Sequence, residues 1–143
     1  MTFRIATEQQ YGRPKVPPKK RRKRTPEQRK EDDHLNFIRV LPCAVCGSRE
    51  RVEAAHLRSG SLEHGKPPTG MGQRPPHRWT TPLCAYHHRE APDAQHNMNE
   101  LAFWSYHGID PFILCKRLWE AKGDVEAMQF VIRTARQYTE KAR

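Results

Sequence analysis

Two pairs of metal-binding side chains, with two residues between the members of each pair, are the first chemical feature of this sequence. The first pair is Cys43 and Cys46, and the second is Cys84 and His87. A short turn within each pair can point both side chains at one ion, and thiolate and imidazole are common ligands of tetrahedral zinc. Buried reduced cysteines are the alternative, but three of the four cysteines stand at ligand spacing. The spacing therefore predicts a structural zinc site.

The fourth zinc ligand has two candidates, because His88 directly follows His87. The two-residue spacing from Cys84 favours His87. Adjacent side chains on a helix point about 100° apart, so His88 is then directed at a second metal ion or at a substrate. The remaining cysteine, Cys115, is expected in the hydrophobic core.

Two further histidines can approach His88 if zinc joins the two pairs. The intervening chain then folds back as a two-stranded hairpin with His56 at the end of its first strand, and His96 follows the helical turn after Cys84. Three imidazoles at one place suit phosphodiester hydrolysis, because one can accept a proton from water while the others bind a divalent ion. We therefore predict that His56, His88 and His96 form a catalytic site.

The other histidines have simpler interpretations. His64 and His77 lie in a long loop, where a solvated side chain is more common than a catalytic one. His34 and His107 are expected to be surface or capping residues. His96 could equally cap the helix that follows it.

The elements that position these residues are short. Strands are predicted at 51–56 and at 79–83, the second running into Cys84, and one or two helical turns are predicted at 86–90. The segment 57–77 is rich in glycine, proline and serine, and a loop of this length inside a domain is usually functional. A short helix or an extended segment at 35–40 opens the folded part.

Three helices are expected in the last third of the chain. The first is capped by Asn97 or Asn99, and the second by Asp110, which a proline follows at the first helical position. The third is capped by Asp124 and has an apolar stripe along one face. Five aromatic residues at helical spacing are expected in the core rather than as stacking platforms for bases: Phe103, Trp104, Phe112, Trp119 and Phe130.

The basic character of the chain is concentrated near its N-terminus. Residues 12–30 contain ten Lys or Arg residues and one acid, and the whole chain has a formal net charge of +10. Such a run repels itself, stays extended and commonly binds nucleic acid. We therefore expect residues 1–33 to form a disordered basic tail and residues 34–143 to form one domain. Only 36% of the residues are hydrophobic, so the core is small, and a bound metal ion would help to stabilise the fold.

These motifs together resemble the HNH, or His-Me finger, endonucleases. The shared pattern is Cys43-x-x-Cys46, Ala55-His56-Leu-Arg58-Ser-Gly60, Trp79-Thr-Thr-Pro-Leu-Cys84, His87-His88, Gln95-His96 and Glu100-x-x-Phe103-Trp104. The combination is similar to phage and prophage proteins related to the RecA-dependent Ref-like recombination nucleases. The resemblance implies an α+β fold: a small zinc-stapled ββα-metal core with additional C-terminal helices.

By this resemblance His56 is the general base, His88 is a ligand of the catalytic divalent ion, and His96 is a second candidate ligand. It implies structural Zn²⁺ together with a catalytic Mg²⁺ or Mn²⁺ ion. One departure is Ala55, which stands where many HNH proteins have an acidic ligand, although Ref-like members share the alanine. Another is that no Asn lies near Trp79. The candidates to complete the metal shell are His64, His77 and Asp93.

The sequence therefore predicts a metal-dependent endonuclease that cuts single- or double-stranded DNA with low sequence specificity, in phage recombination or DNA processing. A RecA-type recombinase filament is a candidate partner. One rival interpretation is a catalytically inactive zinc-binding DNA adaptor, and another is an RNA-binding or RNA-cleaving protein. The basic residues expected to contact phosphates are Lys19, Lys20, Arg21, Arg22, Lys23, Arg24, Arg58, Lys66, Arg74, Arg78 and Arg89.

The sequence also carries expectations about location. The cysteine spacing is that of a metal site and not that of a secreted disulfide framework. No apolar run suits a signal peptide or a membrane span. We expect a cytoplasmic protein of a bacterium or of a phage-infected host cell, without membrane contact.

Overall fold

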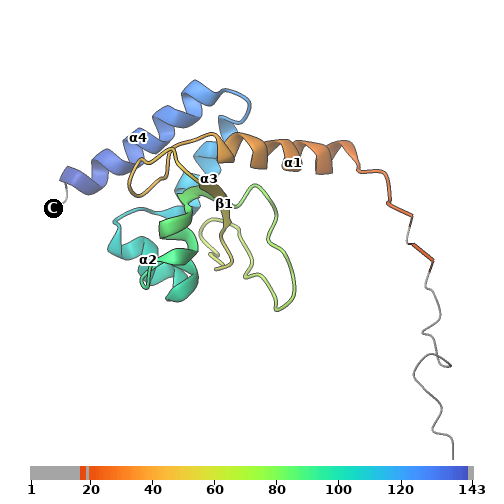
Figure 1. The fold of residues 1–143 in the computed structure, drawn as a ribbon, viewed down its shortest axis with the longest axis horizontal. Coiled ribbons are helices and arrows are strands. Elements are labelled where there is room, and N and C mark those ends of the chain that lie inside the picture. The colour runs from red at the N-terminus through yellow and green to blue at the C-terminus, as the bar shows by residue number, and fades with distance from the viewer. Residues whose placement is uncertain (1–16, 19, 142–143) are drawn as a thin grey trace, which may run out of the picture.

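The computed structural model describes residues 17, 18 and 20–141, with side chains described up to residue 136. It is a small α+β fold in which helices surround one two-stranded sheet (Figure 1). The elements are α1 (Pro26–Arg39), β1 (Val52–His56), β2 (Thr80–Cys84), η2 (Tyr86–Glu90), η3 (Gln95–Asn97), α2 (Glu100–Tyr106), α3 (Pro111–Glu120) and α4 (Val125–Lys141). Within the described residues, no helix is long and apolar enough to cross a membrane.

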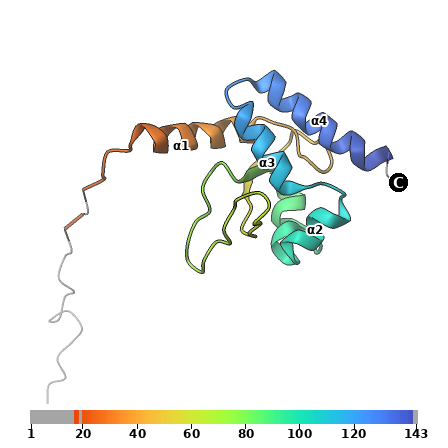
Figure 2. The ribbon, with the colours of Figure 1, turned by 180° about the vertical axis from the view of Figure 1, so that it is seen from behind.

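The sheet is an antiparallel hairpin formed by the two predicted strands. Val52 pairs with Cys84 at one end, and His56 pairs with Thr80 at the other. β2 is buried along its whole length, whereas β1 is mostly half-buried. The connection 57–79 therefore leaves the sheet at the His56 end, and it extends away from the helices as a wide loop (Figure 2).

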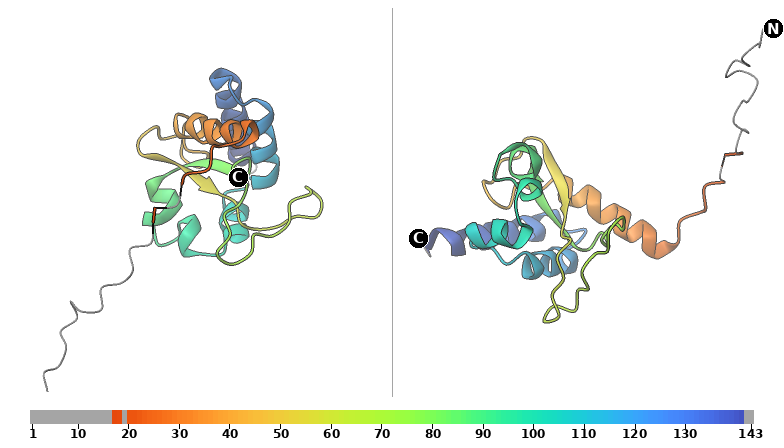
Figure 3. Two further views of the ribbon diagram at one scale, coloured as in Figure 1. Left: turned by 90° about the vertical axis from the view of Figure 1, so that its right-hand side faces the viewer. Right: turned by 90° about the horizontal axis from the view of Figure 1, so that it is seen from below.

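The core lies between the hairpin and the helices α1 to α4, and α2 contributes Phe103 and Trp104 to it. α1 and α3 contact the strands, and α4 packs on α3. In the left view of Figure 3, α1 and α4 lie above the hairpin and α2 lies below it. The fully buried apolar side chains of this core include Ile38, Leu83, Leu118, Met128 and Ile132. Cys115 is also buried, as predicted, and its thiol lies 3.5 Å from the carbonyl oxygen of Thr80.

The helix caps of the C-terminal part are those that the sequence predicted. Asn99 and Asp124 each accept a hydrogen bond from the amide three residues further on, at 3.0 Å. Asp110 accepts from the two amides at the start of α3, at 2.9 and 3.0 Å. These caps satisfy amides that have no partner inside the helix, so each helix begins where its capping side chain stands.

The first helix begins earlier than the predicted boundary at residue 34. Thr25 and Gln28 form a capping box, with each side chain accepting from the other residue's amide, and Pro26 occupies the first turn. The boundary therefore falls inside α1. The disorder predicted for residues 1–33 concerns in part residues 1–16 and 19, including Lys19, which lie outside the described residues.

Three side chains lie where the sequence did not place them. Lys66, expected to contact phosphates, is buried, and its ammonium group donates to the carbonyls of Arg58 and Pro67 at 3.3 Å. His34, expected at the surface, is completely buried against Trp119, with ring centroids 5.0 Å apart. Phe130, expected in the core, is 59% exposed on α4. The buried stripe of α4 is instead centred on Met128 and Ile132, and Phe130 falls on the opposite side of the helix.

Candidate metal centre and histidine pocket

Four potential metal ligands from two separate turns converge at one end of the hairpin. They are Cys43, Cys46, Cys84 and His87, whose ligand atoms all lie within 4.8 Å of one another. The Sγ atoms of Cys46 and Cys84 are 3.8 Å apart, and the Cys84 Sγ atom is 3.2 Å from Nδ1 of His87. Tetrahedral zinc with Zn–S bonds of about 2.3 Å needs sulfur atoms about 3.8 Å apart. The cluster could therefore hold a metal ion, and its donor set is consistent with structural zinc.

Two hydrogen bonds, one of them to β2, hold the turn that contains Cys43 and Cys46 in place. The amide of Cys43 donates to the carbonyl of Ser48 at 2.8 Å, and that of Ala44 donates to the carbonyl of Pro82 in β2 at 2.9 Å. The turn ends at Gly47, which has a positive φ of 74° that suits glycine. The second turn follows β2 directly, so the strand register sets the separation of the two pairs.

The environment of Cys43 fits a bound cation. Burial raises the pKa of the Cys43 thiol to about 12, because a thiolate is poorly solvated inside a protein. A metal ion supplies the opposite charge that allows the thiolate to form. Without such a charge Cys43 remains a neutral thiol at pH 7.

Three histidines from three different elements line one pocket at the other end of β1. His56 comes from β1, His88 from η2 and His96 from η3, and the pocket has a volume of about 470 Å³. The other lining residues are Ala54, Arg58, Gly72, Gln73, Arg74 and Pro75. The histidines that we predicted to meet therefore share a cavity, and the long loop supplies its opposite wall.

Hydrogen bonding orients His88 within this pocket. Its Nδ1 atom lies 2.6 Å from Oε2 of Glu53, and Arg89 donates to the same carboxylate from Nε and Nη2 at 3.1 and 2.8 Å. The hydrogen bond from Arg89, followed by that from His88, lowers the pKa of Glu53 to about 2. An ionised carboxylate only accepts hydrogen bonds, so the proton of neutral His88 lies on Nδ1 and its Nε2 atom has a free lone pair.

His96 lies directly beside His88. The two ring centroids are 4.4 Å apart and the rings are nearly perpendicular. Burial, and then the positive charge that His88 can carry, lower the pKa of His96. His96 is therefore favoured in the neutral form that binds metal ions.

His56 has a histidine partner of its own. Its Nε2 atom lies 2.9 Å from Nδ1 of His77, which comes from the end of the long loop. Burial, and then the charges of His77 and Arg74, lower the pKa of His56 to about 4. His56 is therefore neutral at pH 7, which is the state required of a proton acceptor.

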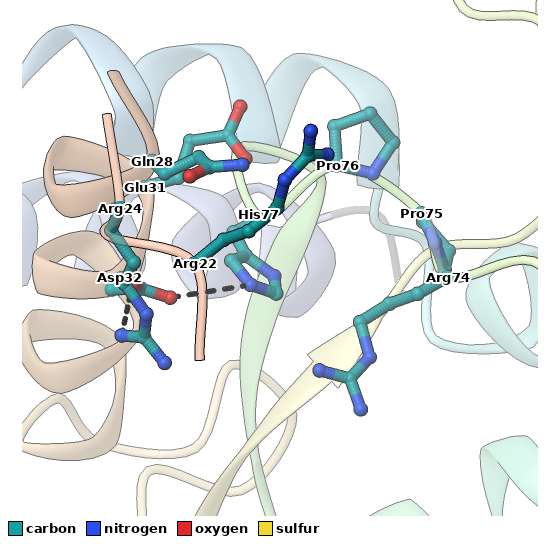
Figure 4. Close-up of a pocket in the computed structure, with 9 residues that line it drawn as sticks. All are labelled: Arg22, Arg24, Gln28, Glu31, Asp32, Arg74, Pro75, Pro76 and His77. Atoms are coloured by element: carbon teal, nitrogen blue, oxygen red, sulfur yellow. Dashed lines mark hydrogen bonds and ion pairs between the residues drawn. The ribbon is translucent and has the colours of Figure 1, made fainter. Parts of the chain in front are cut away.

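A second hollow adjoins the pocket, and Figure 4 shows its lining residues. It has a volume of about 550 Å³ and is lined by Arg22, Arg24, Gln28, Glu31, Asp32, Arg74, Pro75, Pro76 and His77. Arg74 and Pro75 line both this hollow and the histidine pocket. Basic residues that precede α1 therefore lie next to the loop that closes the histidine pocket.

A glutamate on α2 anchors the beginning of the long loop. The carboxylate of Glu100 accepts from the amides of Arg58 and Ser59 at 3.1 and 2.7 Å, and from the Ser59 hydroxyl at 2.6 Å. Gln95 donates to the same carboxylate at 3.1 Å. These bonds hold the chain immediately after His56, so α2 helps to fix the direction of that side chain.

The remaining predicted residues lie at several places. Arg58 lines the histidine pocket, and its guanidinium donates to loop carbonyls at 3.2 Å. Arg78 packs over the Trp79 ring, 5.7 Å from its centroid, and lines a different cavity. Arg89 is paired with Glu53. The residues Lys20, Arg21, Arg22, Lys23 and Arg24 are exposed.

The three residues predicted to complete the metal shell have different surroundings. His64 stacks on Phe112 with centroids 5.2 Å apart and lines a different cavity, away from the other histidines. Asp93 is exposed and does not line the histidine pocket. His77 contacts His56 directly.

Sequence reasoning missed three carboxylates that hold the histidine pocket, namely Asp32, Glu53 and Glu100. Their partners are distant in the sequence: 35 residues separate Glu53 from His88, and 41 separate Ser59 from Glu100. No local spacing signals such pairs. In comparisons of the chain with protein-family models, with curated proteins and with solved structures, nothing matches. What the chain does must therefore be inferred from the chemistry of these residues.

Proposed function

We propose that this protein is a metal-dependent DNA endonuclease of the HNH type, with a structural zinc ion at the Cys43 cluster. The observation that carries the proposal is the pocket shared by His56, His88 and His96. The hairpin, the helical turn of η2 and the adjoining Cys₃His cluster have the order of elements that a ββα-metal core requires. Both the fold and the donor chemistry thus support the same activity.

In the proposed reaction His56 is the general base. Its neutral imidazole accepts a proton from the water molecule that attacks phosphorus. The neutral state follows from its burial and from the positive groups around it, since both lower its pKa. Arg58 and Arg74 on the pocket wall orient the phosphate by charge-assisted hydrogen bonds.

His88 and His96 would hold the catalytic divalent ion. Glu53 keeps the proton of His88 on Nδ1 and so directs the lone pair of Nε2 outward, which is a common arrangement at histidine metal ligands. When bound, the ion supplies a positive charge that stabilises the negative charge developing on the phosphate and on the leaving oxygen. Mg²⁺ is usually held through carboxylates, and the described residues that line the pocket include none. We therefore expect higher activity with Mn²⁺ than with Mg²⁺.

DNA is the proposed substrate because of the charge distribution. The exposed run from Lys20 to Arg24 precedes α1, and Arg22 and Arg24 reach the hollow beside His77 (Figure 4). Each cation that neutralises a phosphate releases a counterion, so this run supports binding that depends on salt but only weakly on sequence. The DNA backbone could pass from this hollow to the histidines over Arg74.

Cleavage of supercoiled plasmid and of single-stranded DNA by the zinc-loaded protein tests the proposal. We expect nicking with Mn²⁺, and we expect His56→Ala to lower it by at least about 100-fold. His64→Ala is the matched control, because His64 lies outside the histidine pocket. Zinc content and circular dichroism show whether both variants fold.

Two outcomes would contradict the proposal. One is DNA binding without cleavage by the wild-type protein with either ion, which would favour the zinc-binding adaptor. The other is equal cleavage by His56→Ala and the wild type, which would remove His56 from the reaction. Cleavage of RNA but not of DNA would show that the same site acts on RNA, and the proposed substrate would be wrong.

A further inference from the structure

A row of three side chains leads from the histidine pocket to helix α1. His56 Nε2 lies 2.9 Å from His77 Nδ1, and His77 Nε2 lies 3.7 Å from Oδ1 of Asp32. The His77 side chain is 14% exposed and that of Asp32 is 29% exposed. Figure 4 shows His77 directed at Asp32 from across the hollow. The row connects the proposed base with a carboxylate on a different element.

Two members of this row, His77 and Asp32, are held in position by other residues. The hydroxyl of Thr80 donates to the carbonyl of His77 at 2.7 Å, which fixes the loop at its return to β2. Arg24 is bonded to Oδ2 of Asp32, which leaves Oδ1 facing His77. Asp32 therefore presents one carboxylate oxygen to the solvent side and the other to the histidine.

The positions of the protons follow from the types of atom. A carboxylate accepts and does not donate, so the nearby Asp32 favours a proton on Nε2 of His77. A distance of 3.7 Å is too long for a direct hydrogen bond, and the carboxylate acts here through its charge. When His77 is neutral and carries its proton on Nε2, it offers a lone pair at Nδ1. His56 must then donate from Nε2, and its own Nδ1 atom is left without a proton.

We infer that Asp32 and His77 are positioning residues that hold the proton of His56 on Nε2 and leave Nδ1 free to accept a proton from water. In a hydrogen-bonded pair of neutral histidines, either ring can be the donor, and the geometry of the pair alone is compatible with both directions of the hydrogen bond. The charge of Asp32 selects the direction in which His56 donates to His77. The consequence for catalysis rests on the proposed nuclease function, whereas the position of the proton does not.

Nitrogen NMR of the zinc-loaded full chain measures the position of the proton directly. In the ¹⁵N-labelled protein without added Mn²⁺ or Mg²⁺, long-range ¹⁵N–¹H correlations distinguish a protonated ring nitrogen from an unprotonated one. The signals of His56, one of eight histidines, are assigned by their loss in His56→Ala. We expect a protonated Nε2 and an unprotonated Nδ1. A proton on Nδ1 of His56 in the wild type would overturn the inference.

Two variants test which residue sets the proton. Asp32→Asn removes the charge and should move part of the His56 population to the form protonated at Nδ1. Its matched control is Asp33→Asn, an identical change at the neighbouring exposed residue of α1. His77→Phe keeps a ring but removes the acceptor nitrogen, so it should also produce a mixture, whether or not Asp32→Asn folds. Equal spectra for Asp32→Asn and Asp33→Asn would show that Asp32 has no such role.

Cleavage kinetics test whether the position of the proton on His56 affects catalysis. With Mn²⁺ and plasmid DNA, Asp32→Asn should lower kcat by about tenfold, because part of the enzyme holds the wrong tautomer, and should leave KM nearly unchanged. Asp33→Asn should retain the wild-type kcat. If the spectra change as expected while no form of the protein cleaves DNA, the inference on the proton stands and the proposed function fails. An unchanged kcat in an Asp32→Asn protein with an altered tautomer would overturn the catalytic part alone.

Discussion

Glu53 of β1 and His88 of η2 contact each other, with 2.6 Å between Oε2 of the glutamate and Nδ1 of the histidine. The strand register pairs Glu53 with Leu83, and η2, which follows β2, brings His88 of the histidine pocket beside the Glu53 carboxylate. Arg89 holds the same carboxylate from its outer side. The carboxylate and the arginine together fix the tautomer and the ring orientation of His88.

Replacing Glu53 should therefore weaken metal binding at the proposed second site. Glu53→Gln removes the charge that keeps the proton on Nδ1 of His88, and the loss of such a partner typically lowers metal affinity by about 10- to 100-fold. Titration with Mn²⁺, followed by electron paramagnetic resonance, measures this affinity. Glu50→Gln is the control, because Glu50 is exposed. Equal Mn²⁺ affinity in the two variants would contradict a role for His88 as a metal ligand.

Removal of zinc should unfold the domain. The Cys₃His cluster ties the turn at Cys43 to the end of β2, so Cys43→Ser should lose the metal ion and the cooperative thermal transition. Cys115→Ser, a substitution of a buried cysteine outside the cluster, should keep zinc and melt cooperatively at a lower temperature. Elemental analysis and calorimetry of both variants measure these effects. A Cys43→Ser protein that keeps zinc would show that the cluster is not the zinc site.

The buried His34 predicts that stability depends on pH. Burial, followed by the charges of Lys122 and His77, lowers the pKa of His34 to about 4, and neither ring nitrogen has a hydrogen-bond partner among the described residues. Between about pH 6.5 and pH 4 the unfolded chain binds a proton that the folded chain does not. The free energy of unfolding should therefore fall as the pH falls through this range, by up to about 3 kcal/mol from this residue.

His34→Phe tests this dependence. Chemical denaturation at several pH values should give a shallower loss of stability below about pH 6.5 in the variant than in the wild type. Acid also releases zinc, but it does so in both proteins, so the difference between their slopes reports on His34. His64→Phe is the control for removal of an imidazole. Parallel curves for His34→Phe and the wild type would mean that His34 takes up a proton in the folded state.

The basic run before α1 predicts how DNA binding depends on salt. Substituting Gln at Lys20, Arg21, Arg22 and Lys23 should reduce the slope of log K against log salt by up to about 4, if each residue contacts a phosphate. Arg24 is left in place because it pairs with Asp32. Fluorescence anisotropy at several salt concentrations measures the slope. An unchanged slope would exclude this run from the DNA interface, and zinc content should be the same in both proteins.

Local patterns were sufficient for the parts of this protein that depend on near neighbours. The ligand spacing of the cysteine pairs, the two strands and the caps at Asn99, Asp110 and Asp124 all follow from short stretches of sequence. Each depends on the geometry of a single turn or strand. The capping box at Thr25 is also a local pattern, but it lies next to the run of basic residues, for which the sequence predicted disorder.

The partners of the histidines depend on how distant segments come together. Glu53 meets His88 because β1 pairs with β2, and Asp32 approaches His77 because the long loop returns beside α1. His34 is buried because it packs against Trp119 of α3, a residue that is distant in the sequence. Residue types reveal which groups can ionise or bind metals. Which ring nitrogen of each imidazole carries the proton depends on the neighbours that folding brings within a few ångströms. Hydrogen bonds act only at those distances, and electrostatic interactions are strongest there.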